Sequence, residues 1–314
     1  MSILIIGSSG FIGVDLCNAL VNDGHNVVCM DVSPNEIIDS PSVELVRGDV
    51  TDYNYLSDLI STRNVDKIVN LSAIVGGASH KYPTKAVAVN CMGFDNVLRA
   101  SVENEVSRVV WTSTYGIYGK SYDYPDGHTI TEDSKPLPSY YRYPEETLYA
   151  ATKQLNEHQS LVYATNHDLS VHGIRPSLVF GPGRLRGYVT SPGRKFMWTA
   201  ELVQKAVAGE ECIIDLSPDD RLNMVYVNDA VRLMSLILDS KSPSHPVYNT
   251  GGHSISIRDL SELIEDITGT PVSWKEDAKP WGRPPVVSHA RAAEDFGYDI
   301  TPLRESIIDY IDRL

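Results

Sequence analysis

Residues 2–13 read SILIIGSSGFIG, and this stretch decides the fold. Its apolar first half predicts a short buried strand, and a run of apolar residues with helical spacing follows the strand. Three glycines separate the two elements, at Gly7, Gly10 and Gly13. Glycine lets the backbone approach a pyrophosphate closely, and the helix that follows presents its N-terminus to the same group. The stretch therefore predicts a dinucleotide site built from strand, turn and helix.

A second predicted strand, residues 26–31 (NVVCMD), ends in Asp31. An acid at that place can accept hydrogen bonds from an adenosine ribose. Its negative charge repels a 2′-phosphate, and residues 32–35 (VSPN) contain no Arg or Lys that could bind one. The sequence therefore favours NAD over NADP as the cofactor.

A pair of residues that could take part in catalysis lies far downstream, in the run LYAATK at 148–153. Tyr149 and Lys153 stand four apart, so they share one face of a predicted helix over 145–166. A lysine ammonium beside a tyrosine favours the phenolate, which suits general acid–base work on an alcohol or a ketone. Taken alone, such a pair is usually an ordinary Tyr/Lys pair on an exposed helix, since YxxxK arises by chance in many helices.

The glycine spacing GxxGxxG and the later YxxxK pair resemble the extended short-chain dehydrogenase/reductase family, which includes NAD-dependent epimerases and dehydratases. Further matches follow in the family's order along the chain. They are GDVTD at 48–52, IVNLSA at 68–73, Asn90, VVWTSTYGIYG at 109–119, IRPSLVFGPG at 174–183 and RLNMVYVND at 221–229. The resemblance implies an α/β fold, with a Rossmann-type doubly wound parallel sheet and a small C-terminal α/β lobe.

The resemblance also implies the residues of the site. Tyr149 is the acid–base group, Lys153 holds the nicotinamide ribose, and Thr114 hydrogen-bonds the reacting oxygen. The implied cofactor contacts are Gly7, Gly10, Phe11, Ile12, Gly13, Asp31, Asp49, Val50, Leu71, Ser72, Ala73, Asn90, Tyr149, Lys153 and Pro176. The implied substrate contacts are Thr114, Leu178 and Arg221.

We expect residues 1–180 to form the NAD-binding domain with the catalytic helix, and residues 181–314 to form mainly a substrate lobe, with some segments returning to the first domain. Further strands are predicted at 43–47, 67–71, 107–112, 169–175, 211–215 and 225–227. Helices are predicted at 53–63, 84–104, 145–166, 196–208, 229–239, 257–267, 290–296 and 302–313. The tyrosine- and proline-rich segment 120–144 precedes the catalytic helix, and it either covers the substrate or packs as a surface loop.

Composition restricts the remaining classes of function. The chain has 314 residues and a formal net charge of −14, which argues against a broad nucleic-acid or anionic-membrane surface. No apolar run reaches transmembrane length and no basic region precedes the first strand, so we expect a cytoplasmic protein without a signal peptide. The four cysteines form no CxxC pair and the nine histidines lack ligand spacing, so we expect neither a disulfide nor a metal site.

Assembly is implied by the resemblance as well. The helices predicted at 84–104 and 145–166 commonly pair across a two-fold axis in the family, so we expect a homodimer. The expected partner is otherwise a small-molecule substrate.

Leu178 and Arg221 bear on that substrate. Family members that act on nucleotide sugars usually carry Asn at the position of Leu178, where it contacts the sugar diphosphate, and leucine cannot make that hydrogen bond. Arg221 is kept, and its guanidinium suits a simple carboxylate as well as a diphosphate. Four further basic residues on predicted loops add local positive charge or are merely solvated: Arg184, Arg186, Arg194 and Lys195.

The sequence leaves three functions open. The favoured one is an NAD-dependent dehydrogenase that oxidises a secondary alcohol, or reduces the ketone, of a small polar or anionic substrate such as a sugar, sugar acid, hydroxy acid or amino acid. The segments 221–229 and 188–207 resemble the branch of the family that handles small hydroxy acids and amino acids. The alternatives are a nucleotide-sugar epimerase that retains NAD and a dinucleotide-binding regulatory protein without catalysis. A dehydratase is disfavoured because Tyr115 and Gly116 replace its Asp-Glu pair.

Overall fold

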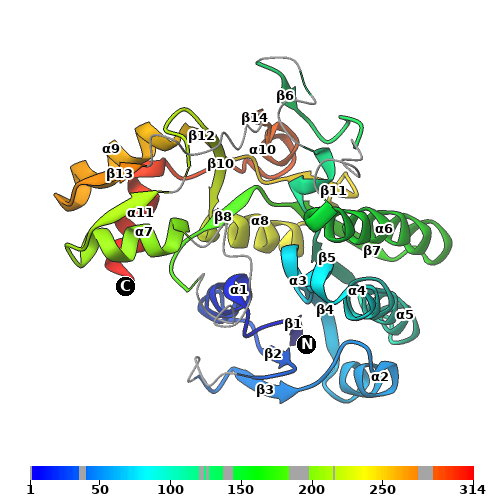
Figure 1. The fold of residues 1–314 in the computed structure, drawn as a ribbon. Coiled ribbons are helices and arrows are strands. Elements are labelled where there is room, and N and C mark those ends of the chain that lie inside the picture. Colours follow the sequence, from blue (N-terminus) through cyan, green and yellow to red (C-terminus); the bar gives the residue numbers. More distant parts are fainter. Residues whose placement is uncertain are drawn as a thin grey trace.

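Seven parallel strands form the central sheet, in the order β11-β7-β5-β4-β1-β2-β3 (Figure 1). The structure is a computed structural model, and it describes residues 2–34, 40–119, 124, 127–136, 144–183, 198–214, 216–274 and 286–314, without the side chains of 144–147 and 198–201. The strands are β1 (Ser2–Ile6), β2 (Val27–Asp31), β3 (Val43–Arg47), β4 (Val65–Asn70), β5 (Arg108–Thr112), β7 (Ser170–Arg175) and β11 (Val247–Asn249). The predicted α/β class and doubly wound parallel sheet are confirmed.

Helices cover both faces of this sheet (Figure 1). They are α1 (Phe11–Asn22), α2 (Tyr53–Thr62), α3 (Gly76–Lys81), α4 (Pro83–Val87), α5 (Phe94–Glu103), α6 (Pro144–His167) and α8 (Val227–Asp239). Side chains of β1 alternate between two hydrophobic cores: Ile3 and Ile5 lie in the core with α1 and α8, while Leu4 and Ile6 lie in the core with α2 and α5. Because the sheet is buried on both faces, its strands are continuous apolar runs such as SILII.

The order of the strands reverses at β1. The chain winds outward from β1 through β2 to β3, and then returns to place β4 on the other side of β1. A reversal of this kind opens a crevice at the carboxyl ends of the strands. Gly7 follows β1 at this point, and a Cβ on Gly7 would lie only 3.0 Å from the backbone N of Ser72, which follows β4. The two strand ends that flank the crevice are therefore in close contact.

A smaller lobe extends from the sheet toward the C-terminus (upper left in Figure 1). Its strands are β8 (Leu178–Phe180), β9 (Cys212–Ile214), β10 (Arg221–Tyr226), β12 (His253–Ser256) and β13 (Val272–Trp274), and its helices are α7 (Trp198–Val207), α9 (Ile257–Thr268) and α11 (Leu303–Asp312). Strands β12, β10 and β8 form one sheet, and β13 pairs with β9. Beside them, β6 (Thr129–Ile130) pairs with β14 (Val286–Val287), and α10 (Ala290–Phe296) packs against β11 and α8.

Several elements differ from the predicted ones. The short strands β6, β8, β11, β12, β13 and β14 and the helix α3 were not predicted. The strand expected at 225–227 is β10, which ends at Tyr226, and α8 begins at Val227 rather than at Asp229. The helix expected at 84–104 contains a π-helical turn, η1 (Ala88–Gly93), between α4 and α5. The described residues do not include most of the segment 120–144, so the prediction that this segment covers the substrate falls outside them. They also do not include the basic residues Arg184, Arg186, Arg194 and Lys195.

Three features of the described residues bear on the compositional expectations. No described helix is long and apolar enough to cross a membrane. No group of three or more His, Cys, Asp or Glu among the described residues is placed to hold a metal ion. All four cysteines are free and buried, although the Sγ atoms of Cys17 and Cys29 lie 2.8 Å apart between α1 and β2.

Candidate active site

The glycine turn forms a cradle that side chains would fill. Gly7 has a φ of 83°, in the left-handed region that favours glycine. A Cβ on Gly13 would lie 2.5 Å from the carbonyl oxygen of Gly7 and 2.6 Å from that of Ser8. Helix α1 begins at Phe11, its N-cap residue Gly10 offers no capping side chain, and its first turn contains no acid. The N–H groups of this turn therefore fit an anionic pyrophosphate.

Asp31 lies next to the cradle, at the position predicted to face the adenosine ribose. Its Oδ2 accepts a hydrogen bond from the backbone N–H of Ser9 at 3.2 Å, and its Oδ1 accepts one from that of Ser33 at 3.0 Å. These bonds hold the half-buried carboxylate beside the glycine turn and leave lone pairs for ribose hydroxyls. No residue from 32 to 34 is basic.

The rest of the predicted cofactor surface follows β3 and β4. Asp49 is exposed, and Val50 is buried against Gly93 of the π-helical turn. Leu71, Ser72 and Ala73 are half-buried on the loop after β4, as is Ile12 at the start of α1, whereas Phe11 is buried in the core. The adenine and nicotinamide sides of the predicted site thus lie along the crevice that the reversal at β1 opens.

Asn90 joins this loop to α6, the helix that carries Tyr149 and Lys153. Its Oδ1 accepts from the backbone N–H of Ile74 at 2.7 Å, and its Nδ2 donates to the carbonyl of Ile74 and to Thr152 Oγ1, both at 3.0 Å. Asn156 on α6 in turn donates to the carbonyl of Asn90 at 2.8 Å. A π-helical turn leaves backbone groups free for such bonds, which is one reason these turns occur at functional sites. Asn90 therefore holds the loop in place, and its predicted contact with the cofactor stays a prediction.

Helix α6 places Tyr149 and Lys153 on one face. The Nζ atom of Lys153 lies 5.9 Å from the ring centre of Tyr149 and 5.7 Å from that of Trp111 on β5. Burial lowers the pKa of Lys153 to about 8. Thr114 follows β5 and begins the 3-10 turn η2 (Tyr115–Tyr118), and α6 packs against this turn. The structure thus places Thr114 beside the helix that carries Tyr149 and Lys153.

The predicted substrate residues lie on the strands of the smaller lobe. Leu178 is 7% exposed, and its strand β8 pairs with β10 so that Leu178 lies opposite Met224. Arg221 begins β10, and its Nη2 donates to the carbonyl of Ser254 at 2.7 Å. Within the described part of the chain, no carboxylate forms an ion pair with Arg221. Pro176 precedes β8, and its carbonyl accepts a hydrogen bond from the backbone N–H of Tyr115 at 3.2 Å.

A buried ion pair behind the site was not predicted. Arg175 Nε and Nη2 donate to the two carboxylate oxygens of Glu157 at 2.8 and 2.7 Å. Ser113 Oγ donates to the same carboxylate at 2.6 Å. Glu157 lies four residues after Lys153, so the two share one face of a helix. This spacing is the signal in the sequence that could have identified Glu157. The partners of Glu157 are the residue after β5 and the last residue of β7, and only the fold brings them together.

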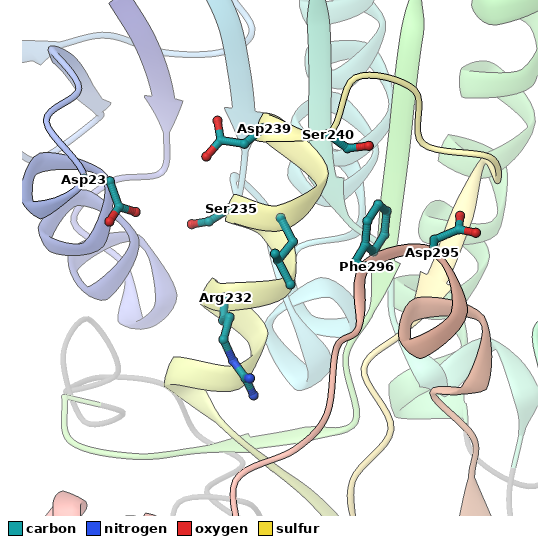
Figure 2. A pocket seen from close by; sticks show the side chains of 8 residues that line it. Asp23, Arg232, Ser235, Asp239, Ser240, Asp295 and Phe296 are labelled. Carbon is teal, nitrogen blue, oxygen red and sulfur yellow. The ribbon is translucent and has the colours of Figure 1, made fainter.

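An open cavity of about 570 Å³ lies between α8, the end of α1 and α10 (Figure 2). It is lined by Asp23, Arg232, Ser235, Leu236, Asp239, Ser240, Asp295 and Phe296. Two of its carboxylates already have partners: Asp239 pairs with Lys67 at 3.4 Å, and Asp295 accepts from Tyr248 at 2.6 Å. The cavity lies where α1 and α8 end, at the edge where parallel strands begin, whereas dinucleotide sites form at the opposite edge. None of the predicted site residues lines it.

Comparisons with known proteins bear on the family and the fold. The profile of the NAD dependent epimerase/dehydratase family matches residues 3–251. A 2-alkyl-3-oxoalkanoate reductase of Stenotrophomonas maltophilia is 32% identical over 86% of this chain and 77% of its own length. The structure of MoeE5 in complex with UDP-glucuronic acid and NAD is 26% identical, with a TM-score of 0.81 over 99% of this chain and 98% of that one.

A likeness in fold alone extends further. The GalE-like L-threonine dehydrogenase from Cupriavidus necator, in its holo form, has a TM-score of 0.85 at 22% identity, over 100% of this chain and 99% of that one. The family profile covers most of the chain, including the glycine cradle, Thr114 and the YxxxK helix. The chain is therefore a member of the NAD-dependent epimerase/dehydratase family, an extended short-chain dehydrogenase/reductase whose family cofactor is NAD.

Proposed function

We propose that the protein is an NAD-dependent dehydrogenase that interconverts a secondary alcohol and its ketone in a small polar substrate, best a hydroxy acid, sugar acid or amino acid that carries a carboxylate. In this proposal residues 1–180 mainly bind the cofactor, and residues 181–314 mainly bind the substrate. The alternative is a nucleotide-sugar epimerase that keeps its NAD bound.

The observation that carries the proposal is the environment of Leu178. Its side chain is buried in the main hydrophobic core, on a strand hydrogen-bonded to β10. At this position nucleotide-sugar enzymes of the family usually use an asparagine amide to contact the diphosphate. A buried leucine offers neither a donor nor an acceptor, so this chain lacks one of the contacts that a sugar diphosphate would need.

Arg221 supports a carboxylate as the recognised group. Its guanidinium is held in place by Ser254, through Nε at 3.3 Å and Nη2 at 2.7 Å. Because no described carboxylate neutralises it, the guanidinium keeps a net positive charge. A guanidinium fixed in this way can bind a carboxylate by two parallel N–H···O bonds.

The proposed chemistry follows from the groups on α6 and β5. Bound NAD supplies the hydride acceptor. Tyr149, as phenolate, takes the proton of the substrate hydroxyl in oxidation and returns it in reduction, while the positive charge of Lys153 favours the phenolate. Thr114 hydrogen-bonds the same substrate oxygen through its hydroxyl. The roles of these three residues are part of the proposal.

The relatives support the two candidates to different degrees. The Stenotrophomonas protein is named as a reductase of a 3-oxoalkanoate, a ketone that carries a carboxylate, and it is 32% identical to this chain. That name agrees with a ketone–alcohol reaction on a substrate that carries a carboxylate. MoeE5 is complexed with UDP-glucuronic acid and NAD, and this supports the alternative at 26% identity.

A panel of both substrate classes tests the proposal. We expect net NADH formation or consumption with a small hydroxy or keto acid, and no interconversion of UDP- or GDP-sugars. Arg221→Ala should raise KM by roughly 10- to 100-fold, from a lost charge-assisted contact of about 1.5–3 kcal/mol, and leave the Kd of NAD unchanged. Arg258→Ala, at a half-exposed arginine on α9, is the matched control. Efficient sugar interconversion without net NADH would replace the proposal with the epimerase.

A further inference from the structure

Both ends of the turn that carries Thr114 are bonded to one buried ion pair. Before the turn, Ser113 Oγ donates to Glu157 Oε1 at 2.6 Å. At its end, the hydroxyl of Tyr118 accepts a hydrogen bond from Arg175 Nη1. Arg175 and Glu157 are joined to each other by two parallel hydrogen bonds, at 2.8 and 2.7 Å. The turn is therefore anchored twice to the same pair.

Most polar atoms of this network have a hydrogen-bond partner. Arg175 Nη1 also donates to the carbonyl of Glu132 at 3.2 Å, and Tyr118 donates onward to Asn249 Oδ1 at 2.9 Å. Burial alone would lower the pKa of Arg175, but its bonds to Glu157 outweigh burial and raise it. Burial raises the pKa of Tyr118 to about 12, although Arg175 acts in the opposite direction. Arg175 is thus charged and Tyr118 neutral across the physiological pH range, so neither group changes its protonation there.

The network also reaches the catalytic helix. Glu157 lies one turn after Lys153 on α6. Because successive turns of a helix have fixed geometry, the position of Glu157 determines that of Lys153. The position of Thr114 relative to Tyr149 and Lys153 therefore depends on how the turn is tied to α6. Thr114 itself has a weaker local constraint, since its Oγ1 accepts from the backbone N–H of Gly116 at 3.1 Å.

We propose that Ser113 and Tyr118, through the Glu157–Arg175 ion pair, are positioning residues that hold the Thr114 hydroxyl in register with Tyr149 and Lys153. Ser113 and Tyr118 are each 1% exposed, which leaves neither side chain a surface for direct contact with a substrate. The catalytic consequence rests on the proposed function, whereas the anchoring of the turn does not.

The first test removes one anchor at a time and leaves the ion pair intact. Ser113→Ala and Tyr118→Phe should each lower kcat by about 10- to 100-fold, because displacing a catalytic group by about 1 Å has an effect of that size. The Kd of NAD should stay within twofold. Ser101→Ala, which removes a buried hydroxyl bonded to Val97 O at 2.7 Å on α5, is the matched control for the first variant. Tyr248→Phe, at a buried tyrosine bonded to Asp295, is the control for the second.

A double-mutant cycle separates positioning from general loosening of the fold. If Ser113 acts through Thr114, Ser113→Ala should change kcat less than threefold in a Thr114→Ala background. The reaction followed is whichever one the substrate panel reveals, because the dehydrogenase and the epimerase would both need Thr114. Equal losses of kcat in both backgrounds, or a lowered Tm with kcat unchanged, would overturn the positioning role.

Amide hydrogen exchange tests the anchoring without any substrate. In the Ser113→Ala/Tyr118→Phe double variant, exchange in residues 113–119 should rise by at least tenfold, while exchange in α9 stays unchanged. Unchanged exchange in 113–119 would refute the anchoring whatever reaction the protein catalyses. A protein that fails on every substrate of the panel but loosens at 113–119 would refute the proposed function and leave the anchoring standing.

Discussion

The Nζ atom of Lys153 lies 5.9 Å from the ring centre of Tyr149, at a position where Lys153 is only 3% exposed. The ring of Trp111 lies at a similar distance, 5.7 Å, so two aromatic rings surround the ammonium. No hydrogen bond joins this ammonium to another described residue. Cation–π contacts stabilise a buried ammonium only partly, and burial accordingly lowers the pKa of Lys153 to about 8.

Lys153→Met should therefore stabilise the protein without cofactor while abolishing its activity. The pKa of Lys153 falls from 10.5 to about 8 on folding, so below pH 8 the folded state carries the full cost of the buried charge. As the pH rises from 8 to 10.5, the folded state loses this proton first and the cost disappears. Urea unfolding at pH 7 should give a gain of roughly 1–3 kcal/mol for the variant, shrinking toward zero at pH 10.

The matched control is Lys205→Met, at an exposed lysine of α7, which should change the free energy of unfolding by less than about 0.5 kcal/mol at either pH. A destabilised Lys153→Met variant at pH 7 would show that the ammonium makes favourable contacts that outweigh its burial.

Tyr149→Phe removes only the phenolic hydroxyl and keeps the ring beside Lys153. Because acid–base help of this kind contributes about 10²- to 10⁴-fold, we expect kcat to fall by that factor. The fold and the Kd of NAD should not change. Steady-state kinetics and NAD titration check both points, with Tyr163→Phe on the same helix as the control. A variant with near-normal kcat would remove Tyr149 from the acid–base role.

Much of the cofactor half could be predicted because its signals are local. The run SILII, the glycine turn and Asp31 follow one another within a single strand–helix–strand unit, and the structure places them at one crevice. The helix expected at 145–166 is observed as α6, Pro144–His167. Its pattern is long and periodic, and this kind of element depends least on distant partners.

The elements that were missed depend on distant partners. Strand β11 has only three residues, VYN at 247–249, and it exists because β7 offers a free edge to it about seventy residues earlier in the chain. Arg175 and Glu157 each sit in an ordinary element, and neither residue indicates by itself that the other will neutralise it. The π-helical turn at Ala88–Gly93 likewise follows from packing against α6, because its backbone bonds go to side chains of that helix.

Asp31 should determine the choice of cofactor. Asp31→Ala removes both the ribose acceptor and the carboxylate that holds the backbone N–H of Ser9, so we expect the Kd of NADH to rise by about tenfold or more. Asp31→Asn keeps the size and one acceptor oxygen and removes the charge, so it should weaken NADH binding less and relax the exclusion of NADPH. Fluorescence titration of both dinucleotides measures these effects. Tighter binding of NADPH than of NADH by the unmodified protein would contradict the assignment.

Exposed apolar side chains on adjacent helices predict a homodimer. Leu155 and Val162 lie seven apart on α6 and so share one face, and both are exposed, as are Val87 on α4 and Met92 on the π-helical turn that packs against α6. Exposed apolar side chains on elements that pack together favour a second copy as their partner, because an isologous contact covers the same surface on both chains. Light scattering at micromolar concentration should give the mass of two chains. Met92→Glu/Val162→Glu should give one chain, whereas Ile213→Glu, at an exposed apolar residue of the smaller lobe, should leave the dimer intact. A monomer for the unmodified protein, or a dimer that survives the double substitution, would exclude this face as the interface.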